Sequence, residues 1–140
     1  MSKLIEMITV HEGKRRFVYR CTSNALTIGV GRNIDANKGG IGLSDDEIAY
    51  LLSNDIERVR KELTGAFSWF EHLDEVRQAA MIDMCFNMGI TSLRKFRKAL
   101  ASMSIKDYDN AAQHFYDSRW AEQVKGRAIK VCNMIRTGEW

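Results

Sequence analysis

Hydrophobic residues recur at helical intervals over most of the chain and at alternate positions over one short stretch. Helical spacing predicts a first helix over residues 2–11, which ends at Gly13. Between Phe17 and Val30 the apolar residues alternate on both sides of the polar sequence Thr22-Ser23-Asn24, which predicts a β-hairpin. Several glycines crowd residues 29–42, so the backbone there can approach a ligand closely.

A long helix is predicted after this glycine-rich stretch. Ser44-Asp45-Asp46-Glu47 has the S-x-x-E form of a capping box, and apolar residues follow at helical spacing as far as Leu63. Residues 73–88 are apolar almost all round, which is typical of a helix buried inside a bundle. Shorter amphipathic helices are expected over residues 91–103, 107–118 and 126–136.

These elements predict an α+β protein. A small β-hairpin lobe is joined by the long helix to a mainly helical C-terminal lobe, and we expect an active-site cleft between the two lobes. The length of 140 residues, with 45% hydrophobic and 28% charged, fits one globular domain. No run of the chain approaches the roughly 18 apolar residues of a membrane-spanning helix, and the N-terminus lacks the apolar core of a signal peptide. We therefore expect a soluble protein, kept in a cytoplasm and not inserted into a membrane.

The spacing of the cysteines and the distribution of charge limit which ligands and partners the chain can be expected to bind. The three cysteines, Cys21, Cys85 and Cys132, show neither a CxxC motif nor the spacing of metal ligands, so we expect free thiols and no metal. Cys85 and Cys132 lie in apolar helical runs, as small buried residues do. Residues 94–136 hold ten Lys or Arg against four Asp or Glu. This basic segment suits nucleic acid, an anionic membrane, an acidic polymer such as the bacterial cell wall, or simply solvent.

The end of the first helix carries a candidate general acid. Glu12 faces the negative end of the helix dipole, which favours its protonated form, and a glycosidase needs a carboxyl group that is still protonated near neutral pH. The alternative is a solvated Glu12, or one bonded to Arg15, Arg16 or a hairpin residue.

Two further candidates lie in the hairpin. Cys21, on the first strand, and Thr27, on the returning strand, can approach each other across a tight hairpin and face the helix end. Cys21 acts either as a small polar filler or as a thiolate in place of a carboxylate. The second role requires a nearby cation such as Arg20 or Arg32.

The stretch HEGKRRFVYRCTSNALTIGVGRNID resembles the catalytic segment of the phage-type lysozymes, the endolysins of tailed phages. In that family a Glu is followed after eight residues by Asp and after five more by the Thr of a TIGxG turn. Glu12, Cys21 and Thr27 keep this spacing, with Cys in place of Asp. The resemblance continues in RQAAMIDMCFNMG, DSRW and RAIKV. It implies one lysozyme-like domain over residues 1–140, with a small lobe at about 13–45 and a helical lobe at about 1–12 and 60–140.

The resemblance implies a muramidase that cleaves the β-1,4 bond between N-acetylmuramic acid and N-acetylglucosamine in peptidoglycan, without metal or cofactor. Glu12 would protonate the glycosidic oxygen. Cys21 would be base, nucleophile or electrostatic stabiliser, and Thr27 would help to hold the attacking water or the sugar. Arg32 stands where relatives often have His. The substrate-binding residues implied by position, some of which differ in type from the family, are Arg32, Asn33, Phe86, Asn87, Ala99, His114 and Arg127.

The family also implies a biological setting and leaves two rivals open. The setting is a monomeric endolysin in the host bacterial cytoplasm, which reaches the wall and lyses the cell once a separate holin-like protein has permeabilised the membrane. One rival is a wall-binding relative that lost its activity through the replacement at position 21. The other is a nucleic-acid binder that uses residues 94–98. The apolar residues in and around this segment have the spacing of an ordinary amphipathic helix with a solvated basic face, so we expect no nucleic-acid partner.

Overall fold

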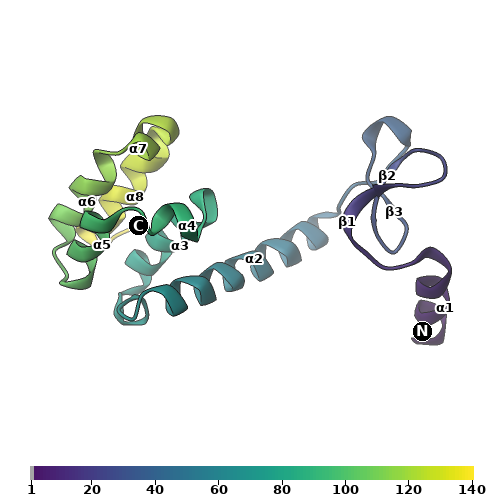
Figure 1. Ribbon diagram of the computed structural model, residues 1–140, viewed down its shortest axis with the longest axis horizontal. Coiled ribbons are helices and arrows are strands. Elements are labelled where there is room, and N and C mark those ends of the chain that lie inside the picture. Colours follow the sequence, from purple (N-terminus) through teal and green to yellow (C-terminus); the bar gives the residue numbers. More distant parts are fainter. Residues whose placement is uncertain (1) are drawn as a thin grey trace. The chain divides into compact units, whose positions relative to one another are not determined.

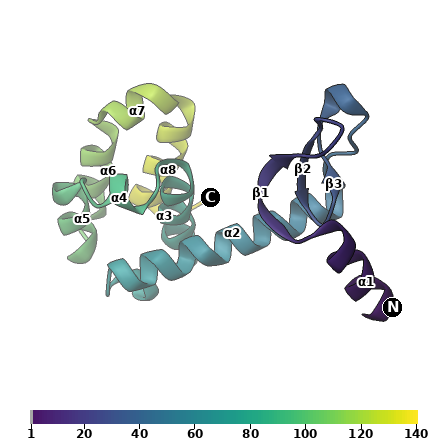
Figure 2. The ribbon, with the colours of Figure 1, turned by 45° about the vertical axis from the view of Figure 1, so that its right-hand side comes forward.

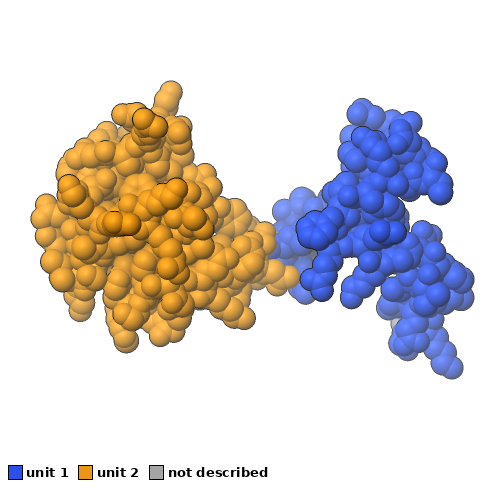
Figure 3. All heavy atoms as spheres, in the orientation of Figure 1, with its two compact units in different colours: residues 1–51 blue, residues 52–140 orange. Residues whose placement is uncertain are grey.

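The computed structural model describes residues 2–140 and divides into two compact units. The sheet unit is Met1–Leu51 and the helical unit is Leu52–Trp140 (Figure 3). The α+β class predicted from the sequence is confirmed, because a small antiparallel sheet precedes a mainly helical part. The organisation as one domain, with residues 1–12 in the helical lobe, stays a prediction.

The sheet unit contains the predicted hairpin and a third strand. The order is β1-β2-β3, all antiparallel, with Tyr19 opposite Thr27 and Thr27 opposite Asn33 (Figures 1 and 2). The third strand has only two residues, too few to show a period of two in the sequence. The elements are α1 (Ser2–Glu12), β1 (Arg15–Arg20), β2 (Leu26–Gly29), β3 (Arg32–Asn33) and the short 3-10 helix η1 (Ala36–Lys38).

The α-helices that follow agree with the sequence pattern except at two places. The single helix expected over residues 91–103 is two helices, because Phe96 leaves helical geometry with ψ 61° and packs its ring 5.4 Å from that of Phe115. Ser118 caps a further helix that the pattern did not separate. The helices are α2 (Asp45–Ala66), η2 (Phe70–His72), α3 (Glu75–Met88), α4 (Ile90–Leu93), α5 (Arg97–Ser104), α6 (Tyr108–Tyr116), α7 (Arg119–Val124) and α8 (Gly126–Thr137).

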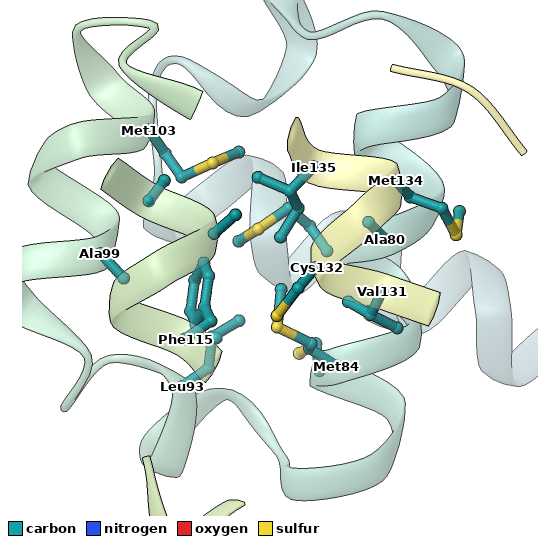
Figure 4. Close-up of a cluster of buried hydrophobic side chains, with 14 of the residues drawn as sticks. Ala80, Met84, Leu93, Ala99, Met103, Phe115, Val131, Cys132, Met134 and Ile135 are labelled. Carbon is teal, nitrogen blue, oxygen red and sulfur yellow. The ribbon is translucent and has the colours of Figure 1, made fainter. Parts of the chain in front are cut away.

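The hydrophobic core of the helical unit forms where α8 packs against α3 and α6 (Figure 4). Cys85 and Cys132 lie within it as predicted, and burial raises the pKa of each thiol to about 11. Arg77 closes one end of the core: its guanidinium donates to the carbonyl oxygen of Ile135 at 2.6 Å and lies 3.7 Å over the ring of Tyr108. No helix within residues 2–140 has the length and apolar character needed to cross a membrane.

Two polar side chains organise the glycine-rich loop of the sheet unit. The buried carboxylate of Asp35 accepts hydrogen bonds from the backbone N–H groups of Leu26 at 3.2 Å and Asn37 at 3.0 Å. The amide of Asn33 accepts from the N–H of Asp35 at 2.9 Å and donates to the carbonyl of Lys38 at 3.0 Å. The loop is therefore held by its own side chains as well as by its turns.

The capping box predicted at the start of α2 is present. Glu47 Oε1 accepts from the N–H of Ser44 at 2.9 Å, and Ser44 Oγ accepts from the N–H of Glu47 at 3.2 Å. Glu47 also forms an ion pair with Arg32 at 2.8 Å, and Arg32 donates to the carbonyl of Gly42 at 2.9 Å. Hydrogen bonding to Arg32 is the largest cause that lowers the pKa of Glu47 to about 2, and the same pair raises the pKa of Arg32.

The Arg32–Glu47 pair gives stability a defined pH dependence. Because the pKa of Glu47 is about 2 in the folded chain against an ordinary 4.5, its contribution is complete above about pH 4.5 and is lost as the pH falls towards 2. We expect Arg32→Gln to lower the free energy of unfolding at pH 7 and to differ progressively less from the native chain below pH 4.5. Urea unfolding at several pH values measures this.

A histidine at position 32 should behave differently. His loses its charge as the pH rises through about 6.5, so Arg32→His should match the native chain most closely at pH 5 and fall behind it by pH 8. Arg16→Gln, at an exposed position of β1, is the matched control. A stability difference for Arg32→Gln that stays constant from pH 7 to pH 2 would contradict this account.

Candidate functional site

The end of α1 lies directly against the turn between β2 and β3. A Cβ atom added to Gly31, which has φ 69°, would lie 2.8 Å from Oε2 and 3.0 Å from Cδ of Glu12. The helix ends just before, where Gly13 donates its N–H to the carbonyl of Thr9 at 2.9 Å. The exposed carboxyl group of Glu12 thus lies beside the TIGVG turn.

The hairpin brings Cys21 and Thr27 together. The N–H of Cys21 donates to the carbonyl oxygen of Ala25 at 3.0 Å, and the hydroxyl of Thr27 donates to the same oxygen at 2.8 Å. Thr27 is 3% exposed and Cys21 is half-buried. The three candidates named from the motif therefore all lie in the sheet unit, two of them on one carbonyl group.

The environment of Cys21 favours the thiolate. Its pKa is lowered from the ordinary 9.0 to about 7, first by a hydrogen bond with Ser23, whose Oγ lies 3.1 Å from Sγ, and then by backbone hydrogen bonds. The sequence suggested a neighbouring cation as the cause, and that expectation is wrong. Arg20 instead donates to the carbonyl of Asn24 at 3.2 Å, and Arg32 is engaged by Glu47.

In the helical unit, Phe86 and Arg127 line a common pocket of about 480 Å³, together with residues of α2, α3 and the C-terminal Trp140. Phe86 is 43% exposed. Arg127 forms a bidentate ion pair with Asp83, with distances of 2.9 and 3.1 Å, which raises the pKa of Arg127. The pocket therefore offers an aromatic ring beside an oriented guanidinium group.

The neighbouring Asn87 is exposed and partly engaged. Its Oδ1 accepts a hydrogen bond of 2.8 Å from the indole N–H of Trp120, which is buried. This bond fixes which end of the amide points inward and leaves the NH₂ group as the outward donor.

Ala99 and His114 line a different pocket, of about 430 Å³, between α5 and α6. Ala99 is 1% exposed and belongs to the core in Figure 4, whereas His114 is exposed. Asn33 and Arg32 bond to their own loop in the sheet unit. The residues proposed to bind substrate thus do not line one pocket, and their substrate roles stay predictions.

Two side chains that interact with candidate site residues were not identified from the sequence. Ser23 stands two residues after Cys21 in a polar turn, a spacing typical of local side-chain hydrogen bonds, so this signal was present. Asp83 is 44 residues from Arg127, and nothing in the chain pattern pairs them. Within residues 2–140, no three His, Cys, Asp or Glu side chains gather as they would around a metal ion.

Several known proteins are similar in sequence to this chain. The chain is 27% identical to the probable T4-type lysozyme 2 of Dictyostelium discoideum, over 99% of this chain and 96% of that protein. It is 29% identical to the pre-baseplate central spike protein Gp5 of Enterobacteria phage T4 over 96% of this chain, which spans only 28% of the spike protein. It is also 29% identical to the SAR-endolysin of Haemophilus phage HP1, over 67% of this chain and 50% of that protein.

The family model described as phage lysozyme matches residues 9–136. This range includes the helix end at Glu12, the hairpin with Cys21 and Thr27, and the helices of the core. The chain belongs to the phage lysozyme family.

Proposed function

We propose that this chain is a muramidase that hydrolyses the β-1,4 bond between N-acetylmuramic acid and N-acetylglucosamine in bacterial peptidoglycan. The observation that carries the proposal is the contact of the Glu12 carboxyl group with the Gly31 turn, in the same unit that holds Cys21 and Thr27 on one carbonyl group. Membership of the phage lysozyme family supports the choice of substrate.

Each of the three residues has a distinct part in the proposed reaction. Glu12 is the general acid that protonates the glycosidic oxygen, and its exposure gives a polymer access to it. The Cys21 thiolate supplies the negative charge that Asp supplies in the family, as base, nucleophile or stabiliser of the oxocarbenium-like state. Thr27 uses its proton on Ala25, so it offers only its oxygen to a water or a sugar.

The substrate contacts proposed in the helical unit follow from the groups of each side chain that remain exposed or without a hydrogen bond among residues 2–140. The exposed ring of Phe86 suits the apolar face of a sugar, and the outward NH₂ of Asn87 suits an N-acetyl carbonyl. Arg127, held by Asp83, attracts acidic groups of the wall. His114 is exposed to a glycan, and the buried Ala99 acts only by shaping the same pocket.

Arg32 and Asn33 act indirectly in this proposal. Their side chains are engaged by the loop and by the start of α2, so we propose that they shape the sheet unit on the substrate side.

The same proposal extends to an endolysin role. The chain would lyse the host cell from within as a monomer, after a separate holin-like protein has permeabilised the membrane. The similarity to a protein named SAR-endolysin supports the endolysin role itself. A wall-binding relative without activity is the alternative, and the first experiment below separates the two.

Substitutions at the two charged positions test the chemistry. We expect Glu12→Gln to abolish lysis, because the amide cannot protonate a leaving group, with a loss of at least about 10²-fold. Cys21→Ser should also abolish lysis, whereas Cys21→Asp should keep it, because only Asp restores a negative charge. The measurement is loss of turbidity of outer-membrane-permeabilised Gram-negative cells. If the native chain is inactive and only Cys21→Asp lyses cells, the protein is a wall-binding relative that has lost its chemistry.

The thiol also predicts a pH profile. Because the pKa of Cys21 is about 7, the thiolate fraction should rise about tenfold between pH 6 and pH 8, and the lysis rate measured relative to that of Cys21→Asp should rise with it, because Glu12 acts equally in both proteins. In Cys21→Asp this rise should vanish, since an ordinary Asp is ionised above about pH 4. A rise of the same size in both proteins would show that another group causes it. Identification of the released anomer by NMR then separates the nucleophile from the base.

The basic surface predicts a salt dependence. Arg94, Lys95, Arg97 and Lys98 are all exposed, so they can hold the protein on an anionic wall polymer. We expect lysis to slow as ionic strength rises, because the range of the attraction shrinks from about 30 Å at 0.01 M salt to about 3 Å at 1 M. Equal lysis rates at low and high salt would contradict this part of the proposal.

A matched pair of variants assigns the salt effect to this surface. Lys95→Gln with Lys98→Gln should flatten the salt dependence, whereas Lys38→Gln with Lys61→Gln, which changes the net charge equally, should leave most of it. If the two double variants flatten it equally, net charge alone is responsible.

A further inference from the structure

The turn that joins β1 to β2 fixes the backbone of Cys21. The N–H of Cys21 donates to the carbonyl of Ala25 at 3.0 Å, and the N–H of Asn24 donates back to the carbonyl of Cys21 at 2.8 Å. Asn24 adopts φ 63°, in the left-handed region that asparagine tolerates better than most residues. Arg20 donates to the carbonyl of Asn24 at 3.2 Å and closes the turn from outside. The position of the Cys21 backbone is therefore set by the turn.

Within this turn, the hydroxyl of Ser23 lies 3.1 Å from the sulfur of Cys21. A thiolate carries no proton, so in the ionised form Ser23 is the donor. Thr27 also lies near the sulfur, but its single hydroxyl proton is donated to Ala25 at 2.8 Å. Among residues 2–140, the Ser23 hydroxyl has no hydrogen-bonding partner besides Cys21. Ser23 is thus the side chain that is free to bind the thiolate.

We propose that Ser23 is a positioning residue that holds the Cys21 thiolate through a hydrogen bond from its hydroxyl, and that this support is needed because a thiol stands where the family has a carboxylate. The catalytic part of this inference rests on the proposed muramidase function. The part that concerns the thiol itself does not.

The charge balance of the site explains why such a partner matters. An Asp at position 21 is ionised at neutral pH without help, whereas an ordinary thiol is only a few per cent ionised there. The hydrogen bond with Ser23 is the largest of the causes that lower the pKa of Cys21 to about 7, ahead of the backbone N–H groups of the turn. Ser23 and the backbone of the turn together thus leave the thiol about half ionised at pH 7, with Ser23 as the largest single contributor.

Thiol alkylation tests the first part without any wall substrate. The rate of iodoacetamide modification of Cys21 in the full chain is measured from pH 5.5 to 9.5 by peptide mass spectrometry. Cys85 and Cys132 provide slow internal references, because both are buried and their pKa values are about 11. In the native chain the rate should reach half of its maximum near pH 7.

Ser23→Ala should move this midpoint to about pH 8 or above and slow alkylation at pH 7 about five-fold. Ser23→Thr keeps a hydroxyl and should restore the native midpoint. Thr22→Ala removes the neighbouring exposed hydroxyl of the same turn and is the matched control. Because Ser23 is exposed, its loss leaves the core untouched. An unchanged midpoint in Ser23→Ala would overturn the proposal, as would an equal shift in Thr22→Ala.

Lysis assays test the second part. Ser23→Ala should slow lysis about five-fold at pH 7 and much less at pH 9, where the thiol ionises without help. In the Cys21→Asp background the same substitution should have at least a fivefold smaller effect at pH 7. Equal losses in both backgrounds would overturn the role of Ser23 through Cys21.

The two assays keep the two proposals distinguishable. If alkylation shifts as expected but neither the native chain nor Cys21→Asp lyses cells, the muramidase proposal fails and the hydrogen bond to the thiolate stands. If lysis depends on Glu12 but the alkylation midpoint does not respond to Ser23, the function stands and this inference fails.

Discussion

The candidate site depends on the close approach of the Glu12 carboxyl group to the backbone at Gly31. A Cβ atom at position 31 would lie only 2.8 Å from Oε2 of Glu12, and the backbone at Gly31 adopts a positive φ that other residues avoid. Glycine is thus favoured at position 31 for two independent reasons, the nearby carboxyl group and the positive φ. Because the turn belongs to the sheet and the acid to the preceding helix, this close approach places the acid beside the turn that follows the strand carrying Thr27.

Cys21 differs in pKa from the other two cysteines of this chain because their surroundings differ. Cys85 and Cys132 lie among apolar side chains, where a thiolate would lose its hydration, and their pKa values are raised to about 11. Cys21 lies in a polar turn in which the Ser23 hydroxyl is 3.1 Å from the sulfur, and hydrogen bonding lowers its pKa to about 7. A few neutral donors from one tight turn therefore lower the pKa of this thiol in the direction that a neighbouring cation would.

The features that the sequence predicted are those that depend on nearby residues. The capping box of Ser44 and Glu47 spans four residues, and the hairpin shows its alternation directly, so both were predictable. The prediction of a single helix over residues 91–103 was wrong. The helical spacing of apolar residues continues across the break at Phe96, and only the packing of that ring in the folded chain shows where the helix is interrupted. The cause of the acidity of Cys21 was missed because spacing identifies charged neighbours but not the direction in which a turn aims its donors.

The ion pair between Arg32 and Glu47 has an entropic consequence. It joins the last strand of the sheet to the first turn of α2, on either side of a loop that contains three glycines. Glycine gives an unfolded chain more freedom than any other residue, so ordering this loop is costly. Because the ion pair holds the two ends of the loop together, folding has to order only the segment between them. The entropic cost of closing such a loop grows slowly with its length. We therefore regard the loop as a segment in which insertions would be tolerated so long as the two charged ends still meet.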